Sequence, residues 1–235
     1  MDLIQVTRRF EINVLTPDTD FRTVSTFAIK HRVPAVVIAP EFAPMVLTDR
    51  SAKNGQYQVI AAIDFPDGKN FCLAKFNTMN VMSLEVDGMD LLLTRGKTEI
   101  ESRNEAKAIR EFLRGSVNPT LDIRYVYGYY TRKWPEVENL IKATEAYPPN
   151  SIRLDQHLEL PNIDVDDHVE AVKKIKEHTP KPIKVSGNVD LETIERLVEI
   201  DNRIKFDVTI KQAMSIIKQL EANNNAEDEV EAKQD

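Results

Sequence analysis

Glycine and cysteine are both scarce in this chain of 235 residues, which has seven glycines and one cysteine, Cys72. A single cysteine cannot form a disulfide within the chain, and such usage is typical of proteins in a reducing compartment. Open sheets that bind dinucleotides normally carry a glycine-rich loop after the first strand. The residues after the first expected strand are Thr16-Pro17-Asp18-Thr19, without glycine. The sequence therefore disfavours a dinucleotide-binding sheet.

Long apolar runs and an excess of positive charge are also missing. No run approaches the roughly 20 apolar residues that a membrane-spanning helix needs, and the first ten residues lack the apolar core of a signal peptide. The formal net charge of −7 argues against nonspecific binding to nucleic acid or to anionic lipid. We therefore expect a cytoplasmic protein with no nucleic-acid or membrane partner.

The sequence does contain a regular alternation of short β-rich runs and longer helical patterns. Several of the β-rich runs are apolar at successive positions, as in Ala35-Val36-Val37-Ile38, and parallel strands covered on both faces require this pattern. The eight runs that we expect to form strands are Phe10–Leu15, Ala35–Ala39, Gln58–Asp64, Met89–Thr94, Ile123–Tyr127, Ser151–Leu154, Pro182–Val185 and Ile204–Val208.

The helical patterns between these runs begin at recognisable capping residues such as Asp20, Asp164 and Asp190. Eight strands that alternate with helices predict a (β/α)8 TIM barrel, formed here by a single domain over residues 1–222. Residues 223–235 are polar, acidic and without periodicity, so we expect a disordered tail there.

Active sites of such barrels lie at the C-terminal ends of the strands, so polar residues at those ends are the candidates for a site. Asp90 lies between two apolar residues and needs a partner, for which Lys184 and Arg153 are the choices. We expect Lys184 to point into the barrel mouth, where desolvation would lower its pKa. The full candidate set is Asp64, Asp90, Tyr127, Arg153, Asp155, His157, Lys184, Ser186 and Asp207.

Two features of this set leave alternatives open. A divalent metal could take oxygen and nitrogen ligands from Asp64, Asp90, Asp155 and His157. Our preferred interpretation includes no metal and no cofactor. Tyr127 belongs to an aromatic group around the fifth strand that either stacks on a sugar or fills space around the barrel mouth.

Several segments resemble the deoxyribose-phosphate aldolase family, whose members are class I aldolases on a (β/α)8 barrel. The resemblance covers most of the chain. The most specific match is Ile60–Gly68, which is similar to that family's third strand and its Phe-Pro-x-Gly turn. Asp90 lies where the family places a proton-relay aspartate, and 183–187 resembles the seventh strand with its second active-site lysine. The resemblance implies an aldolase fold, with Lys184 and Asp90 as the catalytic residues of any surviving activity.

The departures from the family pattern are as informative as the matches. The sixth strand of the family carries the lysine that forms an imine with the sugar, and in our alignment this chain has Arg153. A guanidinium stays protonated and does not condense with carbonyls. The family's small phosphate-binding segment after the eighth strand is replaced by Asp207-Val208-Thr209, and an aspartate there would repel a phosphate.

These observations predict a diverged barrel that has lost aldolase activity and acts by binding a protein partner or a small, non-phosphorylated ligand. The alternative is an active class I aldolase or lyase that acts on a sugar or sugar phosphate with Lys184 as the amine and Asp90 as the acid and base.

Overall fold

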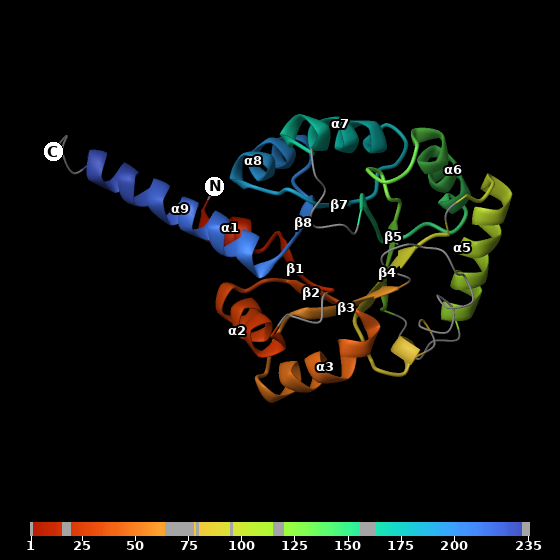
Figure 1. Cartoon of the computed structure of the whole chain (residues 1–235), viewed down its shortest axis with the longest axis horizontal. Coiled ribbons are helices and arrows are strands. Elements are labelled where there is room, and N and C mark those ends of the chain that lie inside the picture. The colour runs from red at the N-terminus through yellow and green to blue at the C-terminus, as the bar shows by residue number, and fades with distance from the viewer. Residues whose placement is uncertain are drawn as a thin grey trace.

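The computed structural model of the chain describes residues 2–15, 20–63, 78, 80–94, 96–114, 120–155 and 163–231. Eight strands, all paired in parallel, close into a barrel in chain order, with helices around the outside (Figure 1). The predicted (β/α)8 architecture is confirmed. The strands are β1 (Phe10–Val14), β2 (Ala35–Ile38), β3 (Gln58–Ile63), β4 (Gly88–Leu92), β5 (Asp122–Val126), β6 (Ser151–Arg153), β7 (Ile183–Ser186) and β8 (Lys205–Val208).

The helices follow the expected order, with one addition at the start of the chain. Helix α1, which we did not predict, begins after Asp2, whose side chain accepts a hydrogen bond from the backbone N–H of Gln5 at 2.7 Å. The described helices are α1 (Leu3–Thr7), α2 (Phe21–His31), the 3-10 helix η1 (Pro40–Phe42), α3 (Ala43–Ala52), α5 (Glu99–Arg114), α6 (Trp134–Thr144), α7 (Val165–Lys176), α8 (Leu191–Ile200) and α9 (Ile210–Glu231).

Helix α9 is longer than the sequence indicated. The helical backbone continues past residue 222, where we placed the end of the folded domain, to Glu231, and this end projects away from the barrel, as the expected tail would (Figure 1). Alanine and glutamate in this stretch favour helix. A short helix without packing partners is nevertheless only marginally stable in water.

Alternation of side chains along the strands builds two separate layers inside the molecule. The larger layer lies between the strands and the surrounding helices, and it includes Met89, Tyr125 and Phe206. The smaller apolar cluster consists of Ala35, Val37, Ile60 and Ala62 from β2 and β3. Since these four residues alternate with members of the larger layer, they face the barrel interior. The other strands turn polar and charged side chains toward that interior.

Candidate functional site

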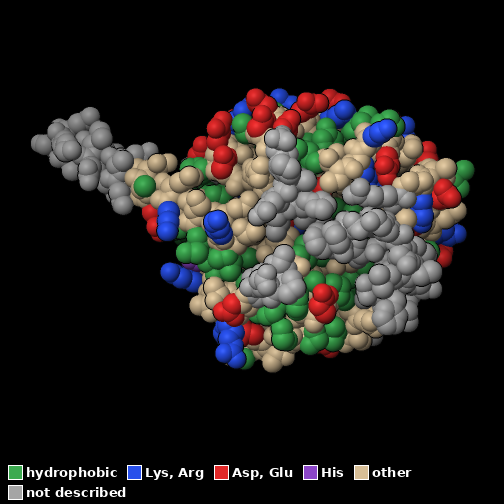
Figure 2. Space-filling view, in the orientation of Figure 1, with side chains coloured by type: hydrophobic (Ala, Val, Ile, Leu, Met, Phe, Trp, Pro, Cys, Tyr) green, Lys and Arg blue, Asp and Glu red, His purple; other side chains and the backbone are tan. Residues whose placement is uncertain are grey.

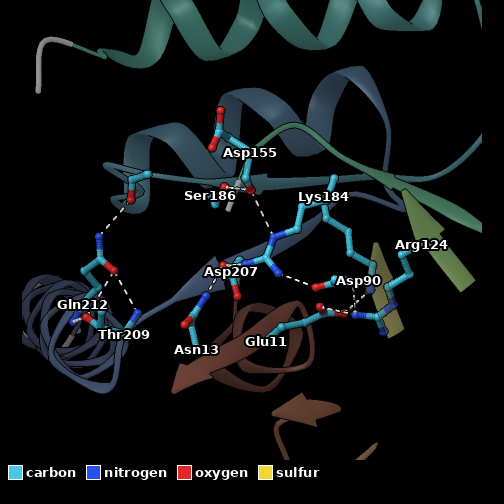
Figure 3. Close-up of polar contacts among 12 residues, drawn as sticks. Glu11, Asn13, Asp90, Arg124, Asp155, Lys184, Ser186, Asp207, Thr209 and Gln212 are labelled. Atoms are coloured by element: carbon cyan, nitrogen blue, oxygen red, sulfur yellow. Dashed lines mark hydrogen bonds and ion pairs between the residues drawn. The ribbon is translucent and has the colours of Figure 1, made fainter. Parts of the chain in front are cut away.

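The inner faces of β1 and β4 to β8 carry a buried cluster of charges, shown in Figure 3. The strand register places these residues side by side: Asp90 is paired with Arg124, Arg153 with Lys184, and Ser186 with Asp207. Every one of them is at most 5% exposed. Such burial requires that each charge be compensated. The central cluster has three carboxylates and three cations, namely Glu11, Asp90, Asp207, Arg124, Arg153 and Lys184.

Arg153 connects two of the three carboxylates. Its Nη1 donates to Asp90 Oδ2, its Nη2 forms an ion pair with Asp207 Oδ2, and its Nε donates to the backbone oxygen of Asp155 at 3.1 Å. Nη1 and Nε therefore donate hydrogen bonds, and Nη2 makes only the ion pair. Contacts on several sides suit the rigid fork of arginine. Asp90 has the partner that its apolar surroundings required, and of the two predicted choices that partner is Arg153.

Lys184 points into the interior as predicted, but its partner is Glu11, which the sequence analysis did not single out. Its Nζ donates to Glu11 Oε1, and Glu11 Oε2 also accepts from Arg124 Nη1 at 2.7 Å. A second contact joins Arg124 Nη1 to Asp90 Oδ1 at 3.7 Å. The signal that could have identified Glu11 is the same as for Asp90, because Glu11 is a charge between the apolar neighbours Phe10 and Ile12.

The pKa values of Lys184 and Glu11 move for opposite reasons. Burial lowers the pKa of Lys184 to about 8, against the effect of Glu11, which raises it. Burial alone would raise the pKa of Glu11, but the nearby charges of Arg124 and Lys184 lower it to about 2. Lys184 therefore remains mostly protonated at neutral pH and holds an ion pair with an ionised Glu11.

Asn13 and Asp207 leave hydrogen-bond acceptors unused within this cluster. Asn13 Nδ2 donates to Asp207 Oδ2 at 2.8 Å. The second oxygen of each residue, Oδ1, is buried and has no hydrogen-bond partner in the structure as described. Nearby, Ser186 Oγ donates to the backbone oxygen of Asp155, and the Asp155 carboxylate accepts from Thr131 Oγ1 at 3.0 Å. The free oxygens of Asn13 and Asp207 are suited to a group that donates hydrogen bonds.

The start of α9 is closed by its own side chains. Thr209 and Gln212 form a reciprocal cap: Gln212 Oε1 accepts from the Thr209 N–H at 2.9 Å, and Thr209 Oγ1 accepts from the Gln212 N–H at 3.1 Å. Gln212 Nε2 also donates to the backbone oxygen of Gly187 at 2.9 Å (Figure 3). Gly187 has a φ of 110°, a region that favours glycine. Backbone N–H groups that would attract an anion at a helix start are thus partly satisfied internally.

One of the predicted site residues that the structure describes, Tyr127, does not join this cluster, and two others are not described. The structure corrects the prediction that Tyr127 lies at the site. Its hydroxyl lies 2.7 Å from Thr144 Oγ1 on α6, in the layer outside the strands. The reason is parity, because Tyr127 is an odd number of positions from the inward-facing Arg124. Asp64 and His157 lie outside the described residues.

The described residues contain no group of three or more His, Cys, Asp or Glu side chains that is placed to hold a metal. The four-residue metal hypothesis depends on Asp64 and His157, so it stays a prediction. In the same described part of the chain, none of the helices is both long and apolar enough to cross a membrane.

Fold and interior together define a (β/α)8 barrel with an ion-paired centre, and comparison with solved structures finds the same fold in aldolases. A deoxyribose phosphate aldolase from Aeropyrum pernix aligns with a TM-score of 0.78 and 11% identity over 94% of this chain and 92% of its own. An aldolase designated QR15 gives 0.70 and 16% identity over 94% and 98%.

A thiamine phosphate pyrophosphorylase from Pyrococcus furiosus is more distant, with a TM-score of 0.52 and 11% identity over 94% of this chain and 96% of its own. No protein-family model and no curated protein matches the sequence. The chain therefore has the fold of deoxyribose-phosphate aldolases, as the sequence resemblance implied, and identities this low establish the fold alone.

Proposed function

We propose that this barrel has lost aldolase activity and binds a small, non-phosphorylated ligand at its mouth. The main observation behind the proposal is that Arg153 on β6 forms ion pairs with Asp90 and Asp207. A guanidinium in this position cannot form an imine. Asp90 is held by the ion pair with this guanidinium, so it is not free to relay protons.

The closed start of α9 supports the exclusion of phosphate. Helix starts and the loops after β7 and β8 are the usual phosphate site of (β/α)8 barrels. In this chain Thr209 and Gln212 cap the helix and Gln212 links it to Gly187. The Asp207 carboxylate, buried just before this segment, adds a negative charge that opposes an anion.

The unused acceptors of Asn13 and Asp207 indicate the chemistry of the ligand. Two buried oxygens without donors favour a ligand that presents hydroxyl or amino groups, because an unsatisfied buried acceptor costs about 1–3 kcal/mol. A neutral polyol or sugar without phosphate meets this requirement. The ligand would complete the hydrogen bonds that the protein leaves open.

Lys184 supports the second candidate function, an aldolase that uses a different lysine. Its pKa of about 8 makes the neutral amine accessible at mildly alkaline pH, and a neutral amine is the nucleophile of class I aldolases. The ion pair with Glu11 and the engagement of Asp90 by Arg153 oppose this role.

Reductive trapping distinguishes the two functions. The full chain is treated with borohydride and 2-deoxyribose 5-phosphate at pH 8.5, and intact mass is measured. We expect no covalent adduct. An adduct that is lost in Lys184→Ala but kept in Lys142→Ala, a change of an exposed lysine on α6, would establish the aldolase and overturn our proposal.

Thermal unfolding tests the ligand class directly. We expect 2-deoxyribose at millimolar concentration to raise the melting temperature, and 2-deoxyribose 5-phosphate to have a smaller effect or none. Asp207→Asn should reduce the difference between the melting-temperature shifts that the two compounds cause, because it removes the charge that opposes phosphate. A larger shift with the phosphate than with the neutral sugar would contradict the proposed ligand class.

A further inference from the structure

A groove lies on the outside of the barrel between α2 and the first half of α9. It has a volume of about 530 Å³, and its apolar lining comes from Phe27, Ile210, Met214 and Ile217. Met214 is 45% exposed, although its neighbours Phe27 and Ile217 are buried. An open groove with an apolar floor is a common docking place for a helix. Its lining comes from α2 and α9 outside the strands, whereas the charged cluster lies on the inner faces of the strands.

The rim of this groove is basic. Arg22 and Lys30 of α2 and Lys218 of α9 line it, together with His31 and one acidic residue, Glu221. Arg22, Lys30 and Lys218 are exposed, and no ion pair neutralises them within the described part of the structure. Figure 2 shows hydrophobic side chains bordered by basic ones beside the base of the projecting helix. The groove therefore favours an occupant with negative charge.

The far end of α9 has the complementary charge. Residues 223–231 contain four acidic residues, Glu227, Asp228, Glu229 and Glu231, and no basic residue. Their backbone is helical and projects beyond the barrel in Figure 1. A helical extension of this kind needs a packing partner if it is to be stable. The same helix thus lines a basic groove with its first half and has an acidic sequence in its second half.

We propose that the groove between α2 and α9 receives the acidic end of α9 from a second copy of this chain. At 1.5 Å per residue the 22 residues of α9 span about 33 Å, so the acidic end is too far along a straight helix to reach its own groove. Two antiparallel α9 helices related by a twofold axis would place each acidic end over the other copy's groove. Such a contact is self-complementary, as a twofold dimer requires. The inference is independent of the ligand proposed for the mouth.

Sedimentation velocity on the full chain tests this dimer. We expect wild type to dimerise at micromolar concentration, with weaker association as salt rises, because the contact is electrostatic. The groove variant Lys30→Glu with Lys218→Glu, and the helix-end variant Asp228→Lys with Glu231→Lys, should each weaken dimerisation at least about tenfold. The control, Lys107→Glu with Lys142→Glu, changes two exposed lysines on α5 and α6 and should dimerise like wild type.

Mixing the two variants gives the sharpest outcome. The acidic groove of the groove variant is complementary in charge to the basic helix end of the other variant. The unchanged basic groove of the helix-end variant is likewise complementary to the acidic helix end of the groove variant. An equimolar mixture should therefore form heterodimers. A wild-type chain that stays monomeric, or variants that do not recover on mixing, would overturn the proposal.

Carbodiimide cross-linking of a mixture of ¹⁴N- and ¹⁵N-labelled chains identifies the occupant. We expect peptides that join Lys30 or Lys218 of one isotope to residues 227–231 of the other. Cross-links within a single isotope only would mean that the helix end folds back onto its own barrel, and this result would also overturn the proposal.

Discussion

The interior of the barrel has an apolar side and a charged side, and the two are stabilised in different ways. On β2 and β3 the inward residues are Ala35, Val37, Ile60 and Ala62, which form an apolar cluster. On β1 and β4 to β8 the inward positions hold three carboxylates and three cations. Each apolar residue contributes by itself through burial. Each charged residue depends on its partners, since the loss of one leaves another charge buried and unpaired.

This difference explains how the arginine on β6 constrains the rest of the interior. Once Arg153 stands on β6, its charge requires Asp90 and Asp207 as partners, and the residues are no longer independent. Lys184 and Glu11 form a second pair, linked to the first through Arg124. The charged side therefore behaves as one network of ion pairs in which each residue depends on the others.

Removal of the Arg153 guanidinium should have the largest effect. Arg153→Leu leaves Asp90 and Asp207 buried without their main cation, and breaking a buried pair in this way costs about 3–5 kcal/mol. Urea unfolding measures this free energy. Ile60→Val on the apolar side is the control and should cost only about 1 kcal/mol. Equal costs for the two variants would show that the charged side is not a dependent network.

Low pH should have the second-largest effect, because it lowers the free energy of unfolding that the charged side contributes. The pKa of Glu11 is lowered from 4.5 to about 2 by folding, so its stabilisation is complete above about pH 4.5 and is lost as the pH falls toward 2. The loss amounts to about 3 kcal/mol at 1.36 kcal/mol per pKa unit. Urea unfolding between pH 5 and pH 3 should show a shallower pH dependence in Glu11→Gln than in wild type. An unchanged slope would contradict the assignment.

Lys184 should give the smallest effect at neutral pH. Burial of its ammonium opposes the gain from Glu11, and Glu11 keeps Arg124 as a partner, so Lys184→Met should change stability by less than about 1 kcal/mol at pH 7. Because its folded pKa of about 8 lies below 10.5, wild-type stability should rise between about pH 8 and pH 10.5. The variant should lack this rise, whereas Lys142→Met, an exposed control, should retain it.

Much of the fold could be predicted from the sequence because its signals are local. Continuous apolar runs gave the strands to within one or two residues, and Glu99–Arg114 and Leu191–Ile200 match their helices. Helix α1 was missed because its five residues carry too short a pattern. The extension of α9 to Glu231 has no counterpart in the sequence pattern, because its acidic end has no apolar periodicity.

The candidate site was only partly predictable. Asp90, Arg153, Lys184, Ser186 and Asp207 were selected because they stand near strand ends, and the structure brings them together. The partners of Glu11, Asn13 and Arg124 follow from register across strands far apart in the chain, which single-sequence patterns do not contain.

The sequence by itself determined the barrel and the presence of an arginine on the sixth strand, since both depend on residue type and order. Only the tertiary structure decided which charges pair, because β1 and β7 meet through closure of the barrel. Glu11 and Lys184 are 173 positions apart in the chain. Their contact depends on closure of the eight strands. The same closure therefore decides whether Lys184 carries a free amine or belongs to a buried ion pair.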